Sequence, residues 1–132
     1  MSLSGLEQVA LVVNVGDVPA ALATPDPRVY PIVEPQNRDI EVKAAKIGVL
    51  AGVTADSNDY TFISVVTATG DCVAYLSTKA IGLTAGTFRE MTLDSDKVEI
   101  EEDETIQLQV DQVSSGVGIC GLTLQLEYEI TA

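Results

Sequence analysis

Residues 122–130 read LTLQLEYEI, an uninterrupted alternation of apolar and polar side chains. The leucines would share one face with Tyr128 and Ile130, and the threonine, glutamine and glutamates would share the other. Successive side chains of a β-strand point to opposite faces, so this pattern predicts a strand with one buried and one wet face. A helix would scatter the same residues around its circumference.

The same alternation recurs in earlier segments of the chain. Its apolar positions are Ile106, Leu108 and Val110, then Val98 and Ile100, and then Met91 and Leu93. In the segment that starts at Asp39, the apolar set runs Ile40, Val42 and Ala44 and then changes phase to Ile47, Val49 and Ala51. A β-bulge near Ala45 would restore the facing of that strand.

Further apolar runs at 9–13, 60–66 and 72–76 add candidate strands, and the TATGD sequence at 67–71 suits a hairpin turn. No long window carries a helical apolar stripe, so a single turn around 77–82 is the most helix that we expect. The sequence therefore predicts an all-β fold, an antiparallel β-sandwich or jelly roll of about eight strands with an extended N-terminal arm.

All five prolines of the chain lie between Pro19 and Pro35. Proline fixes φ, lacks a backbone donor and pushes the preceding residue towards extended geometry, so this stretch should contain no helix. We therefore interpret residues 1–37 as an N-terminal strand and a proline-rich arm, and residues 38–132 as the β-sandwich domain.

Within the arm, the sequence RVYPIV at 28–33 is too apolar for a solvated linker. It either covers its own sheet or contacts another subunit. The candidate assembly contacts of the arm and the first strand are Val9, Leu11, Val13, Tyr30, Pro31, Ile32 and Val33. On this interpretation, deleting residues 1–37 leaves a folded β-domain and weakens assembly.

The composition of the 132 residues restricts the classes of partner. Twenty acidic residues against seven basic ones give a net charge of -13, which repels phosphate backbones and anionic headgroups. We therefore expect neither nucleic acid nor a membrane as partner, and a positively charged docking surface suits the chain. A standard secretory signal is not expected either, because no basic region precedes the short apolar run at 9–13.

The chain contains no histidine. This removes the commonest general base near neutral pH and the commonest metal ligand, and with them the serine–histidine and cysteine–histidine arrangements. Cys72 and Cys120 fit no CxxC pattern, and we expect two buried free thiols. The glycines match no nucleotide-binding spacing. We expect no enzyme, no catalytic residue, no cofactor and no metal.

The densest group of carboxylates has three interpretations: a solvated rim, a cation site or a catalytic pair. Its members are Asp94, Asp96, Glu99, Glu101, Glu102, Asp103 and Glu104. Glu99 and Glu101 alternate with apolar residues and so form the wet face of a strand. The DSD sequence at 94–96 lacks the glycine that a calcium loop needs at its sixth position. The pattern therefore favours a solvated rim.

A sugar-binding surface usually presents exposed aromatic rings, but the chain has no tryptophan and only four tyrosines. Tyr60, Tyr75 and Tyr128 lie inside apolar runs, which favours a place in the core or at a sheet edge. Carbohydrate binding is therefore the less favoured interpretation.

Residues 47–130 resemble, in pattern, the small decoration or head-fibre proteins on the capsids of tailed bacteriophages. The likeness lies in IGVLAGVTADSNDYTF at 47–62, LTAGTF at 83–88, and the run from IQLQV at 106–110 through SSGVG at 114–118 into the last strand. Such proteins often carry a Gly-Asp turn before the penultimate strand, where this chain has EDE at 102–104.

This resemblance implies a jelly-roll-like homotrimer that sits over junctions between subunits of the major capsid protein and stabilises the shell. It places the chain on the capsid surface of a virion that is assembled in the host cytoplasm, and it carries over no catalytic residue. Two other functions stay open: a ligand-binding β-sandwich, such as a carbohydrate-binding or adhesin module, and a tail or fibre component.

Overall fold

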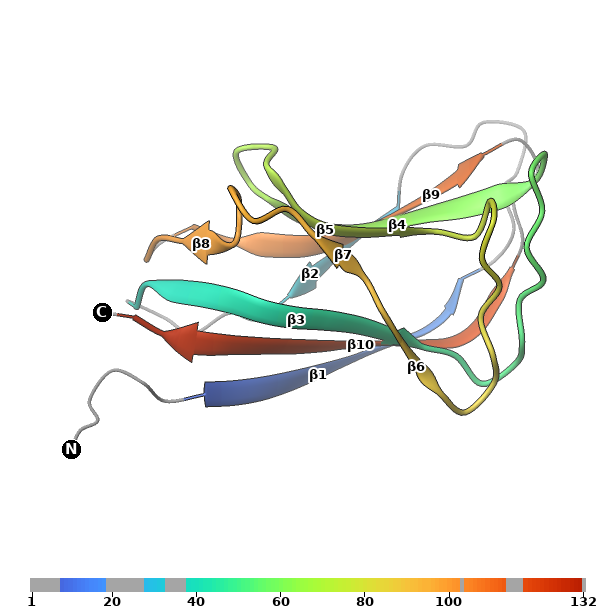
Figure 1. Ribbon diagram of the computed structural model, residues 1–132, viewed down its shortest axis with the longest axis horizontal. Helices are drawn as coiled ribbons and strands as arrows, with labels where there is room; N and C mark the ends of the chain where they lie inside the picture. The colour runs from blue at the N-terminus through green and yellow to red at the C-terminus, as the bar shows by residue number, and fades with distance from the viewer. Residues whose placement is uncertain (1–7, 19–27, 33–37, 103, 114–117, 132) are drawn as a thin grey trace.

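The computed structural model describes residues 8–18, 28–32, 38–102, 104–113 and 118–131 (Figure 1). These residues form ten strands and no helix, which confirms the all-β prediction. The strands are β1 (Gln8–Val18), β2 (Arg28–Ile32), β3 (Ile40–Gly48), β4 (Tyr60–Thr67), β5 (Cys72–Ser77), β6 (Phe88–Glu90), β7 (Thr92–Leu93), β8 (Glu99–Ile100), β9 (Ile106–Val113) and β10 (Ile119–Ile130).

The strands form two antiparallel sheets that face each other as the layers of a sandwich (Figure 1). Sheet A has the order β1-β10-β3-β6, with β8 also paired to β3, and sheet B has the order β2-β9-β4-β5-β7. None of the described segments forms a helix long and apolar enough to cross a membrane.

The core between the sheets is aliphatic, and the alternating segments supply most of it. Leu122, Leu124 and Leu126 of β10 are fully buried, and Tyr128 is 6% exposed. Leu108 and Val110 of β9 are also fully buried. The period-two prediction is therefore confirmed for the two longest patterned segments.

The predicted β-bulge is confirmed in β3. The register pairs Glu127 with Ala44 but Tyr128 with Val42, so the extra residue on β3 is Lys43. The buried face consequently passes from Ile40 and Val42 to Ala45 and Ile47. The bulge lets both halves of β3 bury their apolar side chains in the same core.

The described part of the N-terminal region supplies one edge strand to each sheet. β1 pairs with β10 in sheet A, and β2 pairs with β9 in sheet B. Val18 at the end of β1 is 1% exposed, and Ile32 at the end of β2 is 3% exposed. The structure therefore shows that β2 pairs within its own chain. Each sheet contains one strand from residues 1–37 and strands from the rest of the chain.

One segment passes from one sheet to the other on the side away from those edges. β6 pairs with β3 in sheet A, and β7 pairs with β5 in sheet B (Figure 1). Met91 lies between the two short strands, is 6% exposed, and donates its backbone N–H to the Ala45 carbonyl at 2.7 Å. This crossing lets Phe88 and Arg89 of sheet A line one groove together with Tyr75 and Thr92 of sheet B.

Candidate functional site

The outer faces of the two sheets differ in charge. Residues directly opposite each other in an antiparallel pair share a face, so the register assigns each side chain to the core or to the outside. On sheet A, Lys43 and Lys46 lie outside, with their Nζ atoms 3.2 Å from Glu41 Oε2 and Glu127 Oε2, respectively. That outer face is charged and internally paired.

The outer face of sheet B is nearly uncharged. Its register places outside Val29, Pro31, Tyr60, Phe62, Ser64, Val66, Cys72, Tyr75, Ser77, Thr92, Gln107, Gln109, Asp111 and Val113. Asp111 is the one carboxylate among these residues. In a chain with a net charge of -13, this face is therefore the natural place for contacts that exclude water.

A groove of about 790 Å³ lies where this face meets β6. We call it the aromatic groove, and its lining is Phe62, Tyr75, Leu76, Ser77, Lys79, Ala80, Ile81, Phe88, Arg89, Glu90 and Thr92. The rings of Phe62 and Tyr75 are nearly parallel, with centroids 6.0 Å apart and planes at 15°. Tyr75 is 40% exposed and Phe88 47%. The sequence favoured a core or edge position for Tyr75, but its ring lies in this groove.

Two cations line the aromatic groove. Lys43, Lys46 and Lys97 all form ion pairs with carboxylates. In contrast, Lys79 and Arg89 make no ion pair with another described residue. Lys79 Nζ lies 5.5 Å from the ring centroid of Tyr60, a cation–π contact. Glu90 also lines the groove, so its two cations and one carboxylate leave a net positive charge, and neither cation is ion-paired with a described residue.

A buried polar network fixes the start of the loop that carries Lys79 and Ile81. Thr61 N–H donates to Thr78 Oγ1 at 2.9 Å, and Thr78 N–H donates to the Thr61 carbonyl at 3.0 Å. The Thr61 hydroxyl donates to Gln112 Oε1 at 2.7 Å. Thr61 and Thr78 are fully buried and Gln112 is 4% exposed, so water cannot replace these partners.

We expect Thr78→Val to lower the free energy of unfolding by about 1–3 kcal/mol, because the isosteric change leaves the buried Thr61 N–H without its acceptor. Urea denaturation followed by circular dichroism measures the loss. Thr84→Val is the matched control, since Thr84 is exposed, and it should change stability by less than about 0.5 kcal/mol. Equal effects of the two changes would contradict a structural role for the Thr78 hydroxyl.

The candidate assembly contacts do not converge on one exposed surface. Val9, Leu11, Val13 and Tyr30 are partly buried against the core, Pro31 is exposed, and Val33 lies outside the described residues. Ile32 is 3% exposed and packs in the core of its own chain, so its side chain offers little surface to another subunit.

On the two edge strands, the exposed apolar side chains lie at the positions that alternate with the partly buried ones. Val12 of β1 is 59% exposed, and Val29 of β2 is 48% exposed. The sequence VALVV at 9–13 does not show which of its side chains point outwards, because both faces of that strand are apolar. The register of β1 with β10 shows which side chains point to the core.

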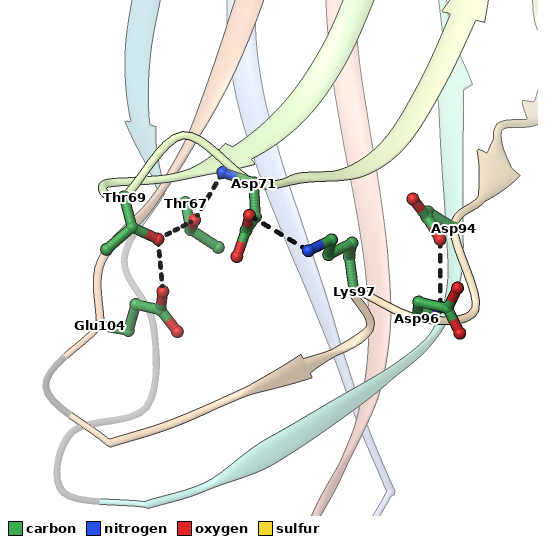
Figure 2. A network of polar contacts seen from close by, with 7 residues as sticks. All are labelled: Thr67, Thr69, Asp71, Asp94, Asp96, Lys97 and Glu104. Atoms are coloured by element: carbon green, nitrogen blue, oxygen red, sulfur yellow. Dashed lines mark hydrogen bonds and ion pairs between the residues drawn. The ribbon is translucent and has the colours of Figure 1, made fainter.

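The acidic rim lies at one end of the sandwich, where three turns meet (Figure 2). The Thr69 hydroxyl donates to Glu104 Oε2 at 3.0 Å, and Lys97 Nζ lies 3.5 Å from Asp71 Oδ1. Asp96 N–H donates to Asp94 Oδ1 at 3.0 Å. Among the described residues, which exclude Asp103, no group of three or more acidic or cysteine side chains is arranged to hold a metal ion. The polar contacts of the acidic rim therefore connect the turn at 67–71 to Lys97 and Glu104.

Both cysteines are free, but the prediction that both are buried is wrong: Cys72 is partly buried and Cys120 is exposed. Cys120 follows buried Ile119 and so points outwards by ordinary alternation, and the irregularity at Gly121, at φ 65°, returns Leu122 to the buried face. Burial, together with the Asp94 charge, raises the pKa of the Cys72 thiol, and the Asp17 charge raises that of Cys120. Both thiols are therefore protonated and weakly nucleophilic at neutral pH.

No protein-family model and no curated protein matches the chain. Among solved structures, a chain from infectious bursal disease virus, Gx strain, superposes with a TM-score of 0.48 and 12% identity over 94% of this chain. A chain from the Gt strain superposes with a TM-score of 0.32 and 13% identity over 95%. This chain spans about a third of each, 32% and 37%. Superpositions of this quality establish neither family nor function.

Proposed function

We propose that the chain is a non-enzymatic decoration or cement protein, a homotrimer that docks onto the major capsid protein and stabilises a viral shell. The observation that carries this proposal is the outer edge of β1. In the described structure β1 pairs on one side only, with β10, and its other edge has no partner strand. A long unpaired edge is a template for a strand from another chain.

The edge of β1 lacks the features that normally protect such strands. Isolated edges usually carry lysine, proline or inward-pointing charge. From Gln8 to Gly16, β1 contains no proline and no charged residue, although charged residues make up 20% of the chain. Its large apolar side chain Val12 is 59% exposed. An edge of this kind suits a strand that is covered in an assembly.

We expect Val12→Lys to weaken binding to the shell at least about tenfold, or about 1.4 kcal/mol, because lysine on an edge strand opposes pairing with another chain. The measurement is co-sedimentation of the purified chain with shells of the virus that encodes it, prepared without this protein. Thermal melting of those shells, with and without the chain, tests the stabilising role. Light scattering of the isolated chain tests the trimer.

Ile81→Lys provides the matched control, since it adds the same charge at an exposed apolar residue on another surface. It should leave shell binding unchanged. Loss of binding with Ile81→Lys but not with Val12→Lys would move the docking surface away from β1. Failure of the unmodified chain to bind any such shell would remove the decoration role altogether.

A further inference from the structure

We propose that the aromatic groove binds a sugar ring that carries an anionic group. This inference does not depend on the shell-docking role, because the groove lies on the outer side of sheet B at β5, β6 and β7, whereas the docking edge is β1 of sheet A. Three properties of the lining carry it: aromatic surface, a net positive charge from cations that form no ion pair with the described residues, and hydroxyl groups.

The aromatic surface comes from segments that the fold brings together. Phe62 of β4 and Tyr75 of β5 are diagonal neighbours on the outer face of sheet B, and Phe88 of β6 lines the groove from the sheet A side, where it pairs with Gly48. Phe88 is held against the backbone, since a Cβ at Gly48 would lie 3.0 Å from its ring. Exposed rings in a groove of this volume are typical of small-ligand sites, and they suit the apolar C–H face of a pyranose.

The charge of the groove selects an anion. Arg89 can hold a carboxylate or sulfate through two parallel hydrogen bonds, and Lys79 adds a second positive charge. The net charge of -13 repels anions at long range, so local cations are what an anionic ligand requires here. A neutral sugar would make no ion pair with either cation.

The remaining polar groups of the groove suit sugar hydroxyls. Ser77 and Thr92 offer hydroxyls that both donate and accept, and Glu90 offers an acceptor. These groups flank the rings, which is the composition of a site that orients a polyhydroxylated ligand.

A peptide fits the groove less well than a sugar. Extended peptides bind mainly through backbone hydrogen bonds along a free strand edge. The strands beside the groove are too short for this, since β6 has three residues and β7 has two. The recognition groups of the groove are side chains, and this favours a compact ligand.

The test is an NMR titration of the full-length, ¹⁵N-labelled chain with glucuronic acid, glucose 6-sulfate and glucose. We expect at least one of the two acids to shift the amide signals of residues 75–81 and 88–92. Glucose should bind at least about tenfold more weakly, because it lacks one charge-assisted contact. Binding of only one acid would identify the anion as carboxylate or sulfate and would support the proposal.

Variants separate the groove from the rest of the surface. Tyr75→Ala should abolish the shifts, and Arg89→Gln should remove the preference for acids over glucose. Lys43→Gln, which makes the same charge change on the outer face of sheet A, should alter neither. If circular dichroism shows that Tyr75→Ala does not fold, Phe88→Ala replaces it, because Phe88 is also exposed.

Three results would overturn the proposal. They are equal affinity for glucose and the acids, no shift with any of the three sugars, and shifts that persist in the Tyr75→Ala variant. Binding of an acidic peptide by a groove that ignores the sugars would assign it to protein docking instead. None of these results bears on shell binding through β1, so the two proposals can fail separately.

Discussion

Replacing Leu124 with aspartate should abolish the fold. Leu124 is fully buried at the centre of sheet A, where it pairs with Val13 of β1 and Ile47 of β3. Aspartate removes the buried leucine and places an unpaired carboxylate in an aliphatic core. We expect a loss of more than about 4 kcal/mol, a large share of the roughly 5–15 kcal/mol that stabilises a typical domain. Urea denaturation followed by circular dichroism measures it.

Thr123→Asp is the control that tests which face of β10 is buried. Thr123 is the next residue along β10, and its side chain is on the outer face of the same sheet, where aspartate stays hydrated. It should cost less than about 1 kcal/mol, mainly through weaker β-propensity. A stable, soluble Leu124→Asp variant, or an equal loss from both changes, would show that the facing of β10 is wrong.

Deleting residues 1–37 has the second largest expected effect, and the structure reverses the expectation drawn from the sequence. The deletion removes β1 and β2, and with them Val18 and Ile32 from the core. Burial of those two side chains alone is worth about 3–6 kcal/mol. It also uncovers one side of β10 and β9, so we expect no cooperative thermal unfolding by circular dichroism and aggregation in gel filtration.

A truncation that starts at Gln8 is the matched control, because it retains all ten described strands. It should melt within a few degrees of the full chain. A compact 38–132 fragment with a cooperative transition would instead restore the prediction that the N-terminal region is a separable arm.

Period-two patterns predicted the strands that bury one full face. β9, β10 and the bulged β3 are long enough for the alternation of apolar and polar residues to be recognised in the sequence. β6, β7 and β8 have only two or three residues each, so their pairing depends on the crossing at Met91 and on the strands beside them. Local sequence contains little information about such tertiary pairing.

The aromatic groove could not be predicted in the same way. Phe62, Tyr75 and Phe88 lie in three different strands; Phe62 and Tyr75 sit in apolar runs that favour a buried position, and Phe88 is followed by Arg89 and Glu90. Only the register of β4 with β5 shows that Phe62 and Tyr75 share the outer face. The absence of tryptophan and the low aromatic content made a sugar site look improbable, yet the fold concentrates half of the six aromatic residues in one groove.

The pairing of β1 with β10 also determines when the chain can fold. Gln8 pairs with Glu129, so the apolar β1 is synthesised before β2 to β9 and cannot pair until β10 has followed them. Sheets closed by such distant partners fold slowly, and their unpaired strands are prone to aggregation during the delay. The many carboxylates give the waiting chain mutual repulsion, which keeps nascent copies apart until β10 arrives.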